Sequence, residues 1–425
     1  MLKRRIKDAD ISDLFDRPKQ IQCVLDEEIR AIAIQQREVV DLTHLDCFSG
    51  PGGICTGFKA TGITTVAAIE KVDSCAVTYT KNHPSVAILR DDIRNISNEA
   101  LKKVAPKGID IITAGMPCET FSTAGSSSRS FYDYRQVLFL EPIRLASAVN
   151  AKVIIFENVP GILTKKLEKG RPELVVNILR KALADAGFGY QKSTVLNARN
   201  YGAAQSRDRF FLIASKDDID YRFPTVSLTF QPTVKDAFAD LPKIDANQGD
   251  LKMKYLSQIN PYISLMRDHA FWGVGSRGDN PSYHAAPNHR PKTLERFKLI
   301  EPGEGLKDLF FKYPKEKVKQ LQDSGILPNK WFIQRNRRLV LNNVSATVTS
   351  HCLDELLHPS LNRALTVREV ARLQSFPDSY DFIGGPYICP HIYETQDKYE
   401  QVGDAVPPLL AYYLGQALIA CLSAK

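Results

Sequence analysis

Cys118 is the side chain best suited to covalent chemistry, and it follows an apolar run that predicts a strand at 109–113. An ordinary cysteine has a pKa of about 8.5, so only a few per cent is thiolate at neutral pH, but that fraction is highly nucleophilic. A lone cysteine is more often a small buried apolar side chain. The groups that lie near Cys118 must therefore decide between these two interpretations.

Charged side chains flank two further predicted strands. Glu157 follows one apolar run, and Arg207 and Arg209 precede another. Two arginines separated by one residue point the same way in an extended chain, which suits binding of a phosphate or a base carbonyl. The alternative interpretation is structural: Glu157 caps a helix or forms an ion pair, and the two arginines form surface ion pairs. In the functional interpretation, Glu157 and Cys118 converge at one edge of a sheet.

A glycine-rich turn, DCFSGPGG at residues 46–53, separates the first predicted strand from a helix. Glycines at such a turn let a ligand approach the backbone and the helix N-terminus closely. Glu70 ends the second predicted strand about twenty residues on, where a carboxylate can bind ribose hydroxyls. Asp92 and Ile93 close the third, where a carboxylate can reach an adenine amine, although an aspartate there also commonly caps a helix. The pattern indicates a nucleoside-containing cofactor, and a NAD-dependent enzyme would share the turn and Glu70.

The elements that position these groups are short apolar runs that alternate with helical stretches from residue 42 onward. Such alternation predicts a mostly parallel sheet with helices on both faces, an α/β fold of the doubly wound type. Ligands of that fold bind at the carboxyl edge of the strands, where the residues above would meet. The predicted strands are 44–48, 65–69, 87–89, 109–113, 153–156 and 210–214.

The domain organisation follows from changes in pattern along the chain. Residues 1–40 predict a helical extension, and residues 41–225 together with 400–425 predict the cofactor-binding domain. The alternation is lost in 226–399, which is rich in Pro, Asn and aromatic residues and has one clear helix pattern at 366–374. This segment predicts a second, smaller and irregular domain.

Composition is typical of a soluble globular protein, with 44% hydrophobic and 24% charged residues. The N-terminal residues MLKRRIKDADIS do not predict a secretory signal, and the longest apolar stretch, 409–422, is too short to span a bilayer and predicts a terminal helix. The eight cysteines contain no CxxC pair, which disfavours both a disulfide framework and a zinc site. We expect a cytoplasmic, monomeric protein without metal or membrane contact.

Positive charge is concentrated between Arg290 and Arg338, where 13 Lys and Arg residues stand against 6 Asp and Glu, a local excess of +7. A polyanion-binding face and an ordinary solvated helical surface both fit this pattern. We call this window the basic segment.

Taken together and in this order, six segments resemble the cytosine-5 DNA methyltransferase family of the prokaryotic modification type. The resemblance covers roughly residues 42–215 and 360–425 and leaves the basic segment outside the motifs. In the family, the intervening segment carries target recognition, so the basic segment becomes a candidate for phosphate contact. The matching segments are DCFSGPGG at 46–53, MPC at 116–118, ENV at 157–159, QSRDR at 205–209, RALTVREVARLQSFP at 363–377 and QVGDAVPP at 401–408.

The resemblance implies a Rossmann-like methyltransferase fold and S-adenosylmethionine as the methyl donor, with S-adenosylhomocysteine as product. The residues that it assigns to the cofactor are Phe48, Gly50, Gly52, Gly53, Glu70, Lys71, Asp92, Ile93, Pro117, Leu138, Asp404 and Ala405.

The same resemblance implies a mechanism in which the Cys118 thiolate adds to carbon 6 of cytosine and so activates carbon 5. Glu157 would bind N3 and the exocyclic amine, Arg209 the O2 carbonyl, and Arg207 would support the backbone or a closed loop. Because the target carbon is stacked inside duplex DNA, the nucleotide must be flipped outward. The polar stretch 122–130 suits a loop that closes over the flipped base.

Three positions depart from the family pattern. Glu119 stands where Gln is common, Gln136 replaces a usual Gly before Leu138, and Asp404 replaces a usual Asn. None of these changes removes a residue with a chemical role.

Three other functions compete with DNA methylation: methylation of transfer RNA, a catalytically idle DNA-binding regulator, and a NAD-dependent oxidoreductase. The long variable segment favours DNA over RNA, and the intact Cys118 and Glu157 disfavour the idle regulator. The oxidoreductase explains only the glycine turn and Glu70. The expected partner is duplex DNA, with a cognate restriction endonuclease for the same site as a second candidate.

Overall fold

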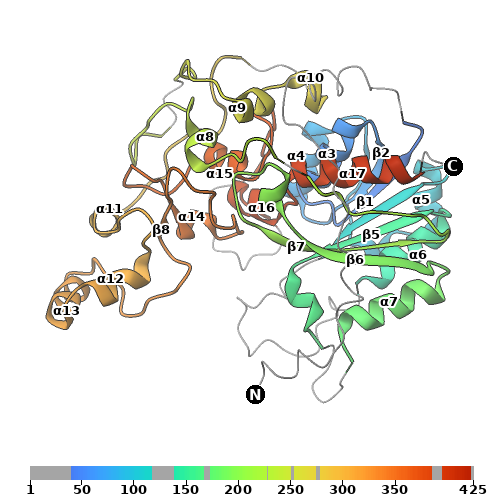
Figure 1. The fold of residues 1–425 in the computed structure, drawn as a ribbon, viewed down its shortest axis with the longest axis horizontal. Coiled ribbons are helices and arrows are strands. Elements are labelled where there is room, and N and C mark those ends of the chain that lie inside the picture. The colour runs from blue at the N-terminus through green and yellow to red at the C-terminus, as the bar shows by residue number, and fades with distance from the viewer. Residues whose placement is uncertain are drawn as a thin grey trace. The chain divides into compact units, whose positions relative to one another are not determined.

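A computed structural model describes residues 40–116, 138–166, 173–226, 228–249, 253–273, 278–384 and 395–422. The chain forms two compact units (Figure 1). The first, here the sheet unit, comprises Met1–Tyr201, Asp208–Thr229 and Pro408–Lys425, and the second unit comprises Gly202–Arg207 and Phe230–Pro407. The helical extension predicted for residues 1–40 lies almost wholly outside the described residues.

A seven-stranded sheet forms the centre of the sheet unit, in the order β3-β2-β1-β4-β5-β7-β6. The first five strands in this order are parallel, and β7 runs antiparallel to both β5 and β6. The mostly parallel sheet confirms the fold class predicted from the alternating pattern. The strands are β1 (Thr43–Cys47), β2 (Thr64–Ile69), β3 (Ala87–Leu89), β4 (Ile111–Gly115), β5 (Val153–Asn158), β6 (Tyr190–Asn197) and β7 (Asp208–Ser215).

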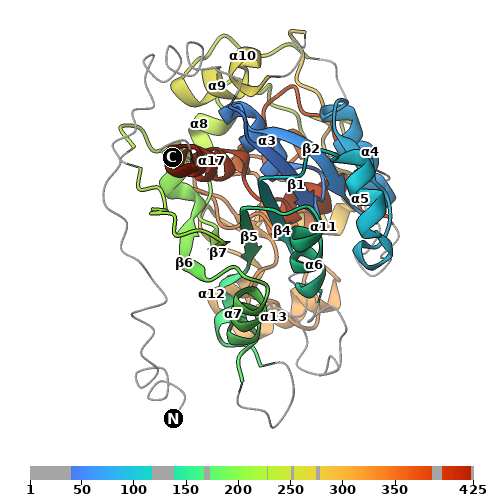
Figure 2. The same cartoon turned by 90° about the vertical axis from the view of Figure 1, so that its right-hand side faces the viewer.

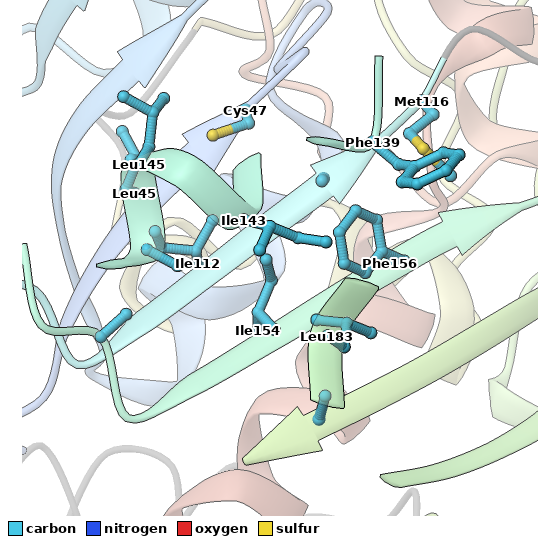
Figure 3. Close-up of a cluster of buried hydrophobic side chains, with 14 of the residues drawn as sticks. Leu45, Cys47, Ile112, Met116, Phe139, Ile143, Leu145, Ile154, Phe156 and Leu183 are labelled. Carbon is cyan, nitrogen blue, oxygen red and sulfur yellow. The ribbon is translucent and has the colours of Figure 1, made fainter. Parts of the chain in front are cut away.

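Successive residues of a strand point to opposite faces of the sheet, so these strands carry apolar side chains on both faces. Helices cover both faces and bury these side chains. On one face, Leu45, Ile112 and Phe156 pack with Ile143 and Leu183, which come from helices between the strands (Figure 3). On the other face, a second cluster contains Cys55 of the helix after β1, Ala68 of β2 and Tyr79 of the helix after β2. The helices of this unit are α3 (Gly53–Thr61), α4 (Asp73–Asn82), α5 (Asn98–Val104), α6 (Leu140–Ala148), α7 (Val175–Asp185) and α17 (Pro408–Leu422), with short 3₁₀ helices at Ile93–Asn95, Pro160–Leu163 and Ala198–Tyr201.

The terminal helix α17 packs directly on α3 (Figure 2). Gly57 permits this approach, since a Cβ at that position would lie 2.5 Å from the backbone nitrogen of Tyr412 and closer still to the carbonyl oxygen of Pro408. Among the described residues, Lys398–Leu422 is the one stretch long and apolar enough to cross a membrane by composition, but 72% of its most apolar window is buried. Its burial is that of a core helix.

The second unit is built from short helices and irregular segments around buried ion pairs. Its helix α15 (Val367–Leu373) lies within residues 366–374, where the pattern predicted a helix, and it begins with a capping box between Thr366 and Glu369. Arg363 binds Glu369, and Arg372 binds Asp240. The other elements are α8 (Val234–Phe238), α9 (Pro261–Met266), α10 (His269–Trp272), α11 (Pro291–Lys298), α12 (Leu306–Lys312), α13 (Lys315–Asp323), α14 (Cys352–Glu355), α16 (Lys398–Asp404) and the short parallel strands β8 (Arg337–Arg338) and β9 (Leu356–Leu357).

Candidate active site

The glycine turn after β1 is held in a left-handed backbone conformation that favours glycine. Phe48, Gly50 and Gly52 have φ values of 56°, 53° and 99°, and Gly52 caps α3 without a side-chain hydrogen bond. A Cβ placed on Gly50 would meet no atom within 4 Å. The backbone angle at position 50 therefore favours glycine, and the space beside it is open. Gly53 is buried at the first residue of α3.

Glu70 is fixed to this turn by two backbone hydrogen bonds. The Gly50 amide donates to Oε2 at 2.8 Å, and the Val72 amide donates to Oε1 at 2.7 Å. Burial raises the pKa of Glu70 above its ordinary value, and the hydrogen bonds oppose that rise. Each carboxylate oxygen has a second lone pair, so the oriented carboxylate can still accept hydrogen bonds from a ligand. Lys71 next to it is exposed.

The end of β3 brings together the residues predicted to bind adenine. Asp92 caps the short helix Ile93–Asn95, and it binds Arg94 at 2.8 Å through Oδ2. The hydrogen bond from the Arg94 side chain lowers the pKa of Asp92. Ile93 and Leu138 are both buried in the core cluster of the sheet unit. Asp92 thus has a structural partner in addition to any ligand.

Glu157 and Arg209 form an ion pair of 2.9 Å at the end of β5, with side chains only 10% and 12% exposed. The antiparallel pairing of β7 with β5 sets their approach, since Glu157 lies opposite Phe211. On its other side, Glu157 is in register with Gly115 of β4, and a Cβ on Gly115 would lie 3.5 Å from its Oε2. The end of β4 therefore closely adjoins this pair.

Cys118 and Pro117 lie outside the described residues, as does the polar stretch 122–130. The residue before them, Met116, is described: its carbonyl oxygen accepts a hydrogen bond of 3.4 Å from the side chain of Asn158. The strand end that leads into the Pro-Cys segment is thereby tied to the strand end that carries the carboxylate.

Arg207 and Arg209 bind different partners, although only one residue separates them. Arg207 is buried in the second unit, where it donates to the carbonyl oxygens of Val348 and, at 2.8 Å, of Gly403. A guanidinium that donates to two backbone carbonyl oxygens holds those two backbone segments together.

Asp404 and Ala405 belong to the second unit, at the end of α16. Ala405 is buried, and its carbonyl oxygen accepts a hydrogen bond of 2.7 Å from Gln374. Asp404 is exposed and accepts a hydrogen bond of 3.0 Å from Gln396.

A buried polar chain beneath the glycine turn was not predicted. His44 contacts Thr65 and Thr113 at 2.9 and 2.7 Å, and Thr113 donates to Asp46 at 2.9 Å. Burial lowers the pKa of His44 to about 3 and, against the Thr113 hydrogen bond, raises that of Asp46 to about 8. The available signal was polar residues at alternate positions of otherwise apolar strands.

A doubly wound sheet with an antiparallel edge pair, a glycine turn and an acidic residue at the next strand end define a Rossmann-like protein with a site for a nucleoside-containing cofactor. Residues 42–420 match the family model described as C-5 cytosine-specific DNA methylase, and the chain belongs to that family. It is a DNA cytosine-5 methyltransferase, and the methyl donor of the family is S-adenosylmethionine.

Individual relatives agree with this assignment. The chain is 32% identical over 382 residues to the Type II methyltransferase M.DdeI of Desulfomicrobium norvegicum, covering 88% of each chain. It is 30% identical to the Type II methyltransferase M1.HphI of Haemophilus parahaemolyticus, covering 89% of this chain and 87% of the relative. Among solved structures, a DNA modification methyltransferase encoded within an Escherichia coli prophage shares the fold, with a TM-score of 0.69 at 24% identity over 90% of this chain and 100% of that one.

Proposed function

We propose that this enzyme methylates carbon 5 of a cytosine flipped out of a specific duplex DNA sequence, with Cys118 as the covalent nucleophile. The ion pair between Glu157 and Arg209 at the carboxyl edge of the sheet carries the proposal. Cys118 follows Gly115 by three residues, and three residues span at most about 11 Å. Because Gly115 adjoins the Glu157 carboxylate, the covalent chain keeps the thiol within reach of the pair.

The proposed chemistry follows from the reactivity of the base. Carbon 5 of cytosine is a poor nucleophile until a group adds at carbon 6. The Cys118 thiolate forms a bond to carbon 6, and the ring electrons move to carbon 5. Glu157 binds N3 and the exocyclic amine of the cytosine, and it favours protonation of N3 as negative charge builds on the ring. Arg209 binds the O2 carbonyl. After methylation, loss of the carbon 5 proton breaks the sulfur–carbon bond and frees Cys118.

The described residues fit S-adenosylmethionine, which supplies an electrophilic methyl group on a sulfonium. The space beside Gly50 is open, and the buried Ser49 hydroxyl has no hydrogen-bond partner among the described residues. Glu70 would bind the ribose, and Asp92 and Ile93 the adenine. The remaining residues of the proposed site are Phe48, Gly52, Gly53, Lys71, Pro117, Leu138, Asp404 and Ala405.

The covalent step is tested by Cys118→Ser, with Cys421→Ser as the control because Cys421 is a partly exposed cysteine outside the proposed site. Cys118→Ser should abolish methyl incorporation and retain binding of S-adenosylmethionine, and Cys421→Ser should keep both. DNA with 5-fluorocytosine at the target should trap wild-type protein in a denaturant-stable adduct, because fluorine cannot leave as a proton does. Methylation by Cys118→Ser would refute the covalent mechanism.

The biological role proposed here is modification in a restriction–modification system, because the relatives M.DdeI and M1.HphI are named Type II methyltransferases. The second unit would recognise the target sequence. We further propose that the enzyme is a cytoplasmic monomer and needs no metal. A cognate restriction endonuclease would recognise the same DNA sequence. Bisulfite sequencing of DNA from expressing cells would identify the methylated sequence, and competition between duplex DNA and transfer RNA would test the choice of substrate.

A further inference from the structure

Part of the positive charge of the basic segment is used inside the second unit. The Arg338 guanidinium donates to the carbonyl oxygens of Ile300, Phe297 and His358. Lys312 pairs with glutamates at 2.8 and 3.1 Å, and Arg335 pairs with an aspartate at 3.0 Å. The local excess of +7 therefore overstates the charge that is free to meet a partner.

Several other lysines of the basic segment are exposed to solvent. Lys315, Lys317 and Lys319 on α13, and Lys330 after it, are exposed and have no ion pair among the described residues. Helices α11, α12 and α13, which Figure 1 labels, contribute to a small apolar core that also includes Leu357 of β9, so these lysines lie on a folded surface.

The six residues 329–334, which have the sequence NKWFIQ and include Lys330, are all exposed. Trp331 is 37%, Phe332 58% and Ile333 61% exposed, and Phe311 of α12 is 68% exposed. The rings of Phe311 and Trp331 are 5.9 Å apart at 68°, and the Lys307 ammonium lies 5.8 and 5.4 Å from their centroids. Large apolar side chains gathered on a surface mark a binding site.

We propose that this aromatic–lysine ridge, formed by Lys307, Phe311 and residues 330–333, binds the substrate DNA through bases as well as phosphates. Exposed rings beside unpaired cations suit stacking on a base or insertion between base steps. Lys307 and Lys330 within the ridge, with the exposed lysines of α13, complement a polyanion, whereas an apolar protein partner would not require them. The inference rests on the DNA substrate of the proposed function and adds a specific apolar contact to it.

The two tryptophans of the chain make the ridge directly observable. Trp272 is fully buried and donates to the Leu265 carbonyl oxygen at 2.8 Å, whereas Trp331 is exposed. Addition of target duplex to the full-length protein should quench Trp331 emission and reduce its access to acrylamide. In Trp331→Phe this response should disappear. An unchanged response in that variant, or none in a wild-type protein that binds and methylates the DNA, would overturn the inference.

Affinity measured against salt separates the two kinds of contact. Trp331→Ala should weaken DNA binding about 5- to 150-fold with an unchanged salt slope, because it removes stacking. Lys330→Ala should reduce the salt slope by about 0.9, the value for one phosphate contact. Both should raise KM for DNA and leave kcat intact. Ile259→Ser, another highly exposed apolar residue of the second unit, and Lys102→Ala on α5 are the matched controls.

Three outcomes count against the ridge. Equal losses in Trp331→Ala and Ile259→Ser would show a general effect of surface apolarity. A wild-type dimer that Ile333→Ser converts to a monomer would identify the ridge as a self-association surface. Wild-type affinity in Trp331→Ala would remove the base contact. By contrast, a wild-type protein that neither binds nor methylates duplex DNA would refute the proposed function itself.

Discussion

Substitution of Gly50 by alanine tests whether the open space beside the glycine turn is the cofactor site. Gly50 has a φ of +53°, and an added Cβ would meet no protein atom within 4 Å. The cost to folding is therefore the left-handed backbone alone, about 1–2 kcal/mol for a residue with a side chain. Gly187 after α7 is the matched control, since its φ is +90° and its Cβ space is equally open.

The two variants should be alike in stability and differ in cofactor binding. Thermal unfolding should report a loss of about 1–2 kcal/mol in each. If the cofactor lies against Gly50, the extra methyl overpacks that contact by about 1–3 kcal/mol, or about 5- to 150-fold in affinity. Calorimetric titration with S-adenosylhomocysteine, which cannot react, measures this difference. Wild-type affinity in Gly50→Ala, or an equal loss in Gly187→Ala, would refute the assignment.

Two further predictions concern charge. Arg209→Gln leaves the nearly buried Glu157 without its cation, so we expect kcat for methyl incorporation to fall about 10²- to 10³-fold, and an unchanged kcat would contradict a role for the pair. Burial alone would raise the pKa of Glu369, but Arg363 lowers it to about 2, whereas burial lowers the pKa of His358 to about 4. Because the pKa of His358 is about 4 in the folded state and 6.5 in the unfolded state, the imidazole takes up a proton in the unfolded state first as pH falls. The free energy of unfolding should therefore fall as pH drops from about 6.5 to 4. The Glu369 contribution, present above its unfolded pKa of 4.5, should be lost as pH falls further towards 2. Urea unfolding against pH measures both effects, and Glu369→Gln should flatten the lower part of the curve.

The parallel part of the sheet was predictable because most of its strands, such as β3 (AIL) and the VIIF part of β5, are short runs of mainly apolar residues between helical stretches. All six predicted strands are present, as β1 to β5 and β7. The strand β6, with the sequence YQKSTVLN, was missed because an edge strand buries little of one side and carries polar residues. Its polar groups bind neighbouring elements: the Ser193 hydroxyl, for example, accepts a hydrogen bond from Arg180 at 2.7 Å.

The site was predictable as far as strand ends determine it. The pattern predicted the glycine turn and Glu70 at the ends of the first two strands, and they lie together there because parallel strands deliver their last residues to one edge. The direct pairing of Glu157 with Arg209 could not be read from the sequence, which assigned each to a different atom of cytosine. It depends on the register of β7 against β5, a long-range pairing that local patterns do not encode.

That pairing gives the proposed mechanism a physical basis for choosing cytosine. An unpaired buried carboxylate costs several kcal/mol, so Arg209 keeps Glu157 oriented before any base arrives. The pair then presents an acceptor and a donor side by side. Cytosine offers an amine to the carboxylate and the O2 carbonyl to the guanidinium, whereas uracil and thymine would place a carbonyl oxygen against the carboxylate. In the proposed mechanism, the ion pair that stabilises the free site would therefore also distinguish cytosine from uracil and thymine.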